Sequence, residues 1–291
     1  MNNKKAVYYR IGGHLIVLQV PSLELTEELL PNFKPFRVGP RKGEIPLFVF
    51  KSGQNIALPK TKPNDRFEWN GIHYEVYQKS TGWILTMKQG EEYCRLSANV
   101  DWTRIKTSLT FSSVSKLIFI NNFLVISYGM SAARFHTLKI HASVTEKNGK
   151  ALIFLGKSGT GKSTHSLLWR EFVPGCSLLN DDEPVVRLFN DGSILVFGTP
   201  WSGKAPCYRN ELAKVIAFVH LKQSPENKLE QLNGVKAFSS LYTSCCLMRS
   251  NTHNKEQVLD TVVTLLERIP VYGLECRPDR EAVALTETLL K

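Results

Sequence analysis

The chain has 291 residues, of which 43% are hydrophobic, so it is long enough for one large domain or two ordinary ones with a substantial core. It carries 37 lysines and arginines against 26 acidic residues, a formal net charge of +11, without any block of five or six like charges. This pattern favours a solvated surface over a nucleic-acid or other anionic partner. The six cysteines include no C-x-x-C pair, which argues against a metal site built from cysteines and favours buried thiols in a reducing, cytoplasmic setting.

Two stretches of the sequence bear on membrane targeting. The ten N-terminal residues are not followed by an apolar segment of the signal-peptide type. The most apolar stretch, residues 117–128, is interrupted by Asn121 and Asn122. The sequence therefore predicts neither a signal peptide nor a membrane span.

Residues 1–108 are predicted to form a small, mostly β N-terminal domain, whose role the sequence does not indicate. Short apolar runs alternate there with turn residues such as Gly12-Gly13 and Ser52-Gly53. Residues 72–77 alternate between apolar and polar, and a second run, residues 83–87, follows the turn at Thr81-Gly82. This arrangement predicts a β-hairpin.

Residues 109–291 are predicted to form a second domain in which strands alternate with helices, so the fold class is α/β for this domain and α+β overall. A helix is expected from residue 117 to about Arg134. Further expected elements are buried strands at residues 151–155 and 215–221, a hairpin of residues 185–188 and 194–197 around Asn190-Asp191-Gly192, a helix closed by Pro270, and a last helix from Asp279 through Leu290.

Residues 156–163 read Gly-Lys-Ser-Gly-Thr-Gly-Lys-Ser and fit the P-loop pattern G-x-x-x-x-G-K-[ST]. The motif lies between a predicted strand and a predicted helix, residues 164–172, which is the context that it requires. In such a loop, backbone N–H groups and the helix N-terminus face the phosphates, the lysine reaches the terminal phosphates, and the hydroxyl binds Mg²⁺. The residues predicted to bind a nucleoside triphosphate are Gly156, Ser158, Gly159, Thr160, Gly161, Lys162, Ser163 and Thr164, with Ser163 also a metal ligand.

A magnesium-dependent site also needs a carboxylate outside the loop, and Asp181 and Asp182 follow the apolar pair Leu178-Leu179. Adjacent side chains on a strand point to opposite faces, so one aspartate could hold metal while the other addresses a nucleophile. A solvated acidic turn is the simpler interpretation of this pair. His141, shortly before the loop, would by itself ordinarily be structural.

Taken together, His141, the P-loop and Asp181-Asp182 resemble the catalytic domain of HPr kinase/phosphorylase, in which a histidine, a P-loop and an aspartate pair follow in this order. The loop and the acidic run are also similar to ATP-dependent phosphoenolpyruvate carboxykinase. The resemblance, which covers residues 117–221, implies a P-loop kinase domain of this type. It implies that Lys162 and Ser163 serve nucleotide and metal, that Asp182 binds metal, and that Asp181 with His141 handles the proton of an acceptor hydroxyl. A ring-like homo-oligomer is also compatible with it.

The segment after the aspartates departs from true HPr kinases, because Gly-Thr-Pro-Trp-Ser-Gly-Lys at residues 198–204 stands in place of their glycine-rich signature. This departure puts HPr itself in doubt as the substrate. The chain is more similar to HPr-kinase-related proteins, some of which resemble serine kinases or accompany peptide-modification systems. Lys204 and Arg209 are candidate cations for stabilising the transferred phosphoryl group, so the candidate catalytic residues are His141, Asp181, Lys162 and Arg209.

The resulting hypothesis is a phosphotransferase that moves a phosphoryl group from ATP, with Mg²⁺, to a serine-type hydroxyl on a protein, peptide or small molecule. One alternative is a P-loop nucleotide hydrolase, including a switch GTPase, although Asn-Lys-Leu-Glu at residues 227–230 matches the guanine-binding motif only in part. The other alternative is an ATP-sensing, peptide-binding module. Phosphoryl transfer that depends on an acceptor would separate the kinase from both.

Overall fold

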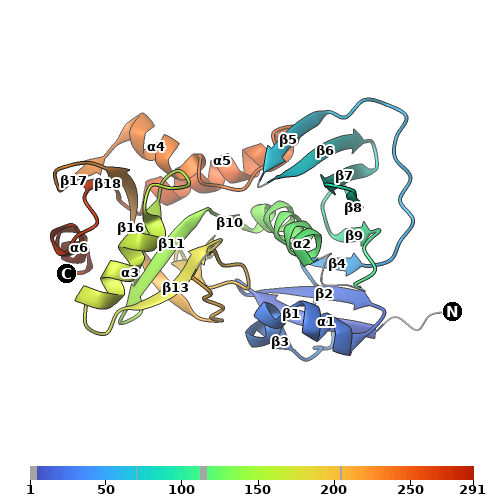
Figure 1. The fold of residues 1–291 in the computed structure, drawn as a ribbon, viewed down its shortest axis with the longest axis horizontal. Coiled ribbons are helices and arrows are strands. Elements are labelled where there is room, and N and C mark those ends of the chain that lie inside the picture. The colour runs from blue at the N-terminus through green and yellow to red at the C-terminus, as the bar shows by residue number, and fades with distance from the viewer. Residues whose placement is uncertain (1–4, 70, 112–116, 204) are drawn as a thin grey trace. The chain divides into compact units, whose positions relative to one another are not determined.

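The computed structural model describes residues 5–69, 71–111, 117–203 and 205–291. The chain forms two compact units (Figure 1). The first contains the chain up to Ala132 together with Leu247–Asn254, and the second contains Ala133–Cys246 and Lys255–Lys291. Each unit combines helices with a large sheet, which confirms the mixed α and β composition expected from the sequence.

The described strands of the first unit form one sheet in the order β3-β1-β2-β4-β9-β8-β7-β6-β5. β4 pairs in parallel with β2 and β9, and the other neighbours are antiparallel. The hairpin expected at residues 72–77 and 83–87 is confirmed as β6 and β7. The strands are β1 Lys5–Ile11, β2 His14–Val20, β3 Arg37–Val38, β4 Phe48–Lys51, β5 Asp65–Trp69, β6 Ile72–Lys79, β7 Gly82–Gln89, β8 Glu92–Asn99 and β9 Arg104–Thr107.

Helix α2, Leu117–Ala132, belongs to the first unit, as do α1, Leu23–Leu29, and the short helix η1, Pro31–Phe36. The Tyr128 hydroxyl donates a hydrogen bond to the Ile11 carbonyl at 2.9 Å, and the Ser131 hydroxyl donates to the Trp102 carbonyl at 2.7 Å. These buried bonds attach α2 to the N-terminal sheet. The boundary expected between residues 108 and 109 therefore does not coincide with the division of the structure, which follows Ala132.

Among the described residues, one helical stretch, Leu117–Phe135, is long and apolar enough to cross a membrane by length and composition. A core helix has the same properties, and 61% of the tested window is buried in the protein. The absence of a membrane span thus stays a prediction.

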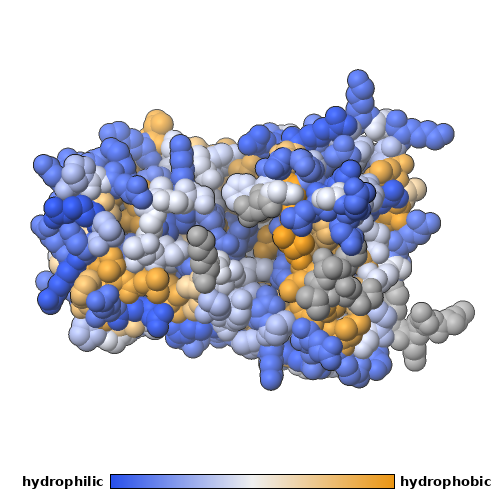
Figure 2. Space-filling model, viewed as in Figure 1, coloured by the Kyte–Doolittle hydropathy of each residue, from blue (hydrophilic) through white to orange (hydrophobic). Residues whose placement is uncertain are grey.

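On the face seen in Figure 2, hydrophilic residues cover most of the surface and smaller apolar areas lie between them.

The second unit has a mixed sheet in the order β10-β14-β15-β16-β12-β11-β13, extended by β18 beside β16 and by β17 beside β18. β16 pairs in parallel with β12 and β18, and the remaining pairs are antiparallel. The strands are β10 Thr137–Lys139, β11 Ala142–Lys147, β12 Lys150–Leu155, β13 Ser177–Asp182, β14 Val185–Leu188, β15 Ile194–Phe197, β16 Leu212–Gln223, β17 Lys228–Leu232 and β18 Val271–Cys276. The strands and the hairpin expected in this region are confirmed.

Helices α3 and α6 of the second unit pack on this sheet. Helix α3 contributes Trp169 to a buried cluster with Phe154, Val219 and Val283. The expected last helix is confirmed, and the Asp279 side chain caps it by accepting from the Ala282 N–H. The helices are η3 Ala133–Phe135, α3 Lys162–Phe172, α4 Gly234–Tyr242, α6 Arg280–Glu287 and η4 Thr288–Leu290, and α5, Thr252–Leu266, begins in the first unit and ends in the second.

One edge of this sheet collects four chain segments. The parallel strands β12 and β16 end there, β11 begins there because it runs antiparallel to β12, and β13 ends there because it runs antiparallel to β11. The residues just outside these strand ends therefore lie side by side, although they are far apart in sequence. This edge is where the glycine-rich loop leaves β12.

Candidate functional site

The glycine-rich loop joins β12 to α3, which is the strand–loop–helix context that the motif requires. Gly156, Gly159 and Gly161 have φ angles of 142°, 83° and 98°, a region that glycine adopts without strain. At Gly156 a side chain also lacks room, since a Cβ atom would lie 2.7 Å from the Thr160 hydroxyl oxygen. The loop therefore turns tightly over the sheet edge, and α3 begins directly with Lys162.

Lys162 lies beneath the loop and is 8% exposed. Its Nζ atom is 2.9 Å from the Gly156 carbonyl oxygen, 3.2 Å from the Lys157 carbonyl oxygen and 3.1 Å from Nε2 of His141. These three acceptors match the three N–H donors of an ammonium group. Burial lowers the pKa of Lys162, while the charges of Asp182 and Asp181 act in the opposite direction.

His141 connects Lys162 to Asp182. Its Nδ1 atom is 2.9 Å from Oδ1 of Asp182. Because the ammonium group of Lys162 only donates, Nε2 is the accepting nitrogen of His141, and Nδ1 carries the hydrogen that is donated to Asp182. The contacts of the described residues thus form a chain from Lys162 through His141 to Asp182.

The resemblance pairs His141 with Asp181, whereas the structure places it on Asp182. The register of the sheet explains the difference. Ala142, the first residue of β11, lies opposite Asp182, the last residue of β13. The residue immediately before β11 is therefore adjacent to Asp182, and the described residues show no hydrogen bond or ion pair between His141 and Asp181.

Asp182 has a strained backbone, with φ of 135°. A residue other than glycine in this region costs about 1–3 kcal/mol, so surrounding contacts must hold it there. Asp182 forms an isolated β-bridge with Ser202, and the carbonyl of Asp181 accepts hydrogen bonds from the Gly203 N–H and, at 3.1 Å, from the Ser202 hydroxyl. The segment that departs from the HPr-kinase signature thus fixes the backbone of the aspartate pair.

Asn180 is the second anchor of this turn, and the sequence analysis missed it. It is fully buried, and its Nδ2 donates to the Trp201 carbonyl at 3.0 Å and the Thr199 hydroxyl at 3.2 Å. Its Oδ1 accepts from the Glu183 N–H at 3.0 Å. An amide directly before an acidic pair was the available signal, since asparagine commonly bonds the backbone of turns.

The two aspartates occupy different surroundings, as expected for neighbours at a strand end. Asp181 is 2% exposed, and its Oδ2 atom has no hydrogen-bond partner among the described residues. The side chain of Asp182 is 37% exposed. A buried carboxylate oxygen without a partner is uncommon in native proteins, so Asp181 has one acceptor atom that a proton, a water molecule, a cation or a ligand hydroxyl would satisfy.

A buried ion pair between Lys139 and Glu183 lies beside the site and was also missed. Burial acts to lower the pKa of Lys139, but the adjacent Glu183 carboxylate raises it above its usual range. Ligand atoms of His141, Asp182 and Glu183 lie within 4.8 Å of one another. Since Glu183 pairs with Lys139 and His141 accepts from Lys162, Asp182 is the member of this group that fits a cation best.

The remaining predicted residues fall into three groups. The Thr160 hydroxyl donates to the Lys157 carbonyl at 2.9 Å and so stabilises the loop, while Ser158 and Thr164 are exposed and Ser163 is half-buried in the first turn of α3. Arg209 is not part of the site, because it donates to the Ser177 hydroxyl at 2.7 Å, at the opposite end of β13 from Asp182. Lys204 lies outside the described residues.

The partial guanine motif also has a structural role. The Asn227 side chain donates to Oδ1 of Asp279 at 3.0 Å and to Oε2 of Glu281 at 2.8 Å. These bonds attach the start of β17 to the first turn of α6. Asn227 therefore stabilises the end of the chain in this structure.

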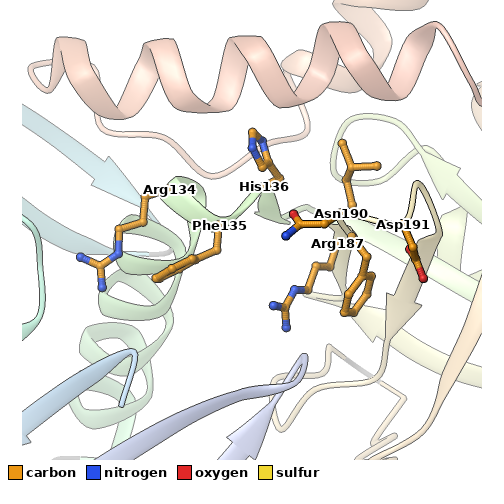
Figure 3. Close-up of a pocket in the computed structure, with 8 residues that line it drawn as sticks. Arg134, Phe135, His136, Arg187, Asn190 and Asp191 are labelled. Atoms are coloured by element: carbon orange, nitrogen blue, oxygen red, sulfur yellow. The ribbon is translucent and has the colours of Figure 1, made fainter. Parts of the chain in front are cut away.

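A cavity of about 560 Å³ lies away from this site. It is lined by residues 134–136, before β10, and residues 187–191, in the β14–β15 hairpin (Figure 3). The Arg134 and Arg187 guanidinium groups lie 4.8 and 4.5 Å from the ring centroids of Phe135 and Phe189. None of Lys162, His141 and Asp182 lines it.

A scan of the sequence against protein-family models finds no match, and neither does a search among curated proteins.

Proposed function

We propose that this protein is a phosphotransferase that moves the terminal phosphoryl group of ATP to a hydroxyl acceptor in the presence of Mg²⁺. The observation that carries the proposal is the contact chain of Lys162, His141 and Asp182 beside the N-terminus of α3. A lysine, a helix N-terminus and a carboxylate at one sheet edge suit the charges of a triphosphate and a divalent cation.

The loop residues suit the phosphates for separate physical reasons. The positive φ angles at Gly156, Gly159 and Gly161 bend the backbone into a tight loop, whose N–H groups could then face an anion. The first-turn N–H groups of α3 have no partner within the helix. Lys162 adds a positive charge. When a nucleotide binds, its ammonium group would donate to phosphate oxygens in place of the Gly156 and Lys157 carbonyls.

Ser163 and Asp182 are the residues that would hold Mg²⁺, because a hydroxyl and a carboxylate are oxygen ligands of the kind it prefers. When bound, Mg²⁺ neutralises part of the phosphate charge. His141 holds the Asp182 carboxylate in one orientation through its Nδ1–H. This role replaces the direct help to Asp181 that the resemblance implies.

Asp181 is the proposed proton acceptor for the incoming hydroxyl. Its Oδ2 atom has no hydrogen-bond partner among the described residues, and its backbone is fixed by Ser202 and Gly203. A carboxylate that is held in place needs little reorganisation when the hydroxyl proton moves to it. The acceptor is a serine-type hydroxyl, and the experiment below decides between a small molecule and a peptide or protein.

The test is to incubate the protein with Mg²⁺ and ATP labelled at the terminal phosphate, together with free serine, serine-containing peptides or cell extract. Labelling of an acceptor is the expected result. Lys162→Ala should abolish ATP binding measured by calorimetry, whereas Lys157→Ala, at an exposed lysine of the same loop, should leave it nearly unchanged. Phosphate release without any labelled acceptor would replace the proposal by a nucleotide hydrolase, and ATP binding without turnover would replace it by an ATP-sensing module.

The roles of the aspartates are tested with isosteric amides. Asp182→Asn should weaken Mg²⁺-dependent ATP binding, and Asp181→Asn should leave binding nearly intact while lowering single-turnover transfer by at least about tenfold. The opposite pattern would exchange the two roles. If neither variant differs from the wild type, the pair is the solvated turn of the simpler interpretation.

A further inference from the structure

His220 lies at the same sheet edge as the glycine-rich loop, and the proposed phosphoryl transfer does not use it. In the parallel ladder of β12 and β16 it lies opposite Leu155, the residue directly before Gly156. The following residues of β16 also contact the loop. A Cβ at Gly156 would lie 3.2 Å from the Leu221 carbonyl oxygen, and the Gln223 side chain donates to the Gly159 carbonyl at 3.2 Å. The end of β16 therefore runs alongside the loop.

The side chain of His220 is directed away from the core under α3. Val219 and Leu221 belong to the buried cluster that includes Trp169 of α3, and side chains alternate along a strand. His220 therefore projects from the opposite face, where its Nδ1 is 2.7 Å from the Ser240 hydroxyl oxygen of α4. Burial and the charge of Lys162 both lower the pKa of His220, which is consistent with a neutral imidazole near that lysine.

The hydrogen bond with Ser240 determines which imidazole nitrogen carries the hydrogen. Ser240 is 4% exposed, and His220 is the sole partner of its hydroxyl among the described residues. If the hydroxyl only accepted, its own hydrogen would be buried without an acceptor, which is costly. Ser240 therefore donates to Nδ1, and the hydrogen of the neutral ring is on Nε2.

We propose that the Nε2–H group of His220, oriented by Ser240, donates a hydrogen bond to the β- or γ-phosphate of the nucleotide held by the loop. This inference rests on the proposed function, because it requires a triphosphate at Lys162. Within the described residues, no acceptor is bonded to Nε2 of His220. A neutral N–H group can donate to the phosphates beside Lys162 without repelling its positive charge. Because it would contact only the β- or γ-phosphate, it would favour ATP over AMP.

The experiment measures binding of Mg²⁺–ATP, inorganic tripolyphosphate and AMP to the full chain by calorimetry. Relative to wild type, His220→Ala should weaken ATP and tripolyphosphate binding about tenfold and leave AMP binding unchanged, as expected for one hydrogen bond to a charged group. His220→Gln, which retains an N–H donor near the Nε2 position, should stay within about threefold of wild type. Ser240→Ala should lie between the two, because the ring then loses its preferred hydrogen position.

A matched control is His73→Ala, since His73 is an exposed histidine of the first unit. Equal affinities of wild type and His220→Ala for ATP, with Lys162→Ala still defective, would overturn the inference and leave the proposed function standing. Equal weakening of AMP and ATP binding would show a merely structural role and would also overturn it. If His220→Ala does not fold, His220→Gln and Ser240→Ala are compared instead. Weaker ATP binding by Ser240→Ala than by His220→Gln would support the inference, and equal ATP binding by the two variants would overturn it. If wild type does not bind ATP, the proposed function fails and the inference fails with it.

Discussion

The ion pair between Lys139 and Glu183 allows a quantitative test of how the acidic turn is stabilised. The side chains are 8% and 19% exposed, so solvent screens their charges poorly. Glu183→Gln keeps the shape but leaves the Lys139 ammonium in a buried position without its counter-charge. Removal of one partner of a buried pair typically costs 3–5 kcal/mol, and because Glu183 keeps some exposure we expect about 3 kcal/mol.

The assay is urea denaturation at pH 7, followed by tryptophan fluorescence, with the free energy of unfolding as the result. The double variant Lys139→Met, Glu183→Gln removes both charges and should recover to within about 1 kcal/mol of wild type. The control is Glu275→Gln in the exposed pair with Lys222, which should change stability by less than about 1 kcal/mol. A Glu183→Gln variant as stable as wild type, or a double variant no better than the single one, would refute the reasoning.

Three further predictions concern the loop, its helix and the acidic turn. Asp182→Gly should be more stable than Asp182→Ala by about 1 kcal/mol in the same assay, because glycine relieves the strain at φ 135°. This relief outweighs the lower unfolded-state entropy that usually makes alanine variants more stable than glycine variants. An Asp182→Ala variant more stable than Asp182→Gly would show that the strain is absent. Burial lowers the pKa of His165 to about 4, so the unfolded chain binds more protons than the folded protein between the two pKa values and stability falls as the pH falls. His165 should thus contribute a loss of about 3 kcal/mol between pH 7 and pH 4, and His165→Gln should show a correspondingly smaller pH dependence. Gly156→Ala should lower the melting temperature and weaken ATP binding, since its Cβ meets the Thr160 hydroxyl, and Gly90→Ala, at a turn glycine with positive φ but no atom within 4 Å of a Cβ, should leave ATP binding unchanged.

Local patterns in the sequence predicted the elements that carry the loop. The strand–loop–helix unit and the hairpin at Asn190-Asp191-Gly192 depend on glycine positions and on short apolar runs, so a window of about ten residues contains the information. The same holds for the start of the last helix, where Asp279 is the N-cap residue. These predictions are confirmed.

The contacts that shape the site could not be predicted, because they depend on the register of the sheet. Nothing in the sequence indicates that β11 pairs with β13 so that Ala142 lies opposite Asp182, yet this pairing decides which aspartate contacts His141. Arg209 is close to the candidate segment along the chain but binds the far end of β13. Sequence proximity was thus a poor guide to spatial proximity.

The domain boundary was difficult to predict for a different reason. Helix α2 is buried on most of its surface, as the burial of Phe119, Ile120, Phe123, Leu124 and Tyr128 shows. A helix that is apolar on all sides has no polar stripe to indicate which sheet it covers. Its attachment to the first unit depends on bonds to residues as distant as Ile11, which no local pattern reveals.

The division of the chain has a practical consequence for dissecting the protein. Residues 247–254 belong to the first unit, so the polypeptide passes between the units after Ala132, after Cys246 and after Asn254. Neither unit is a continuous stretch of sequence. A fragment that starts at Ala133 would still contain residues 247–254 without the rest of the first unit, directly after Cys246, whose N–H donates to the carbonyl of Lys139. A truncation that isolates the second unit should therefore also replace residues 247–254 with a short flexible linker, because a single proteolytic cut after Ala132 would free residues 1–132 and leave Leu247–Asn254 attached to the second unit.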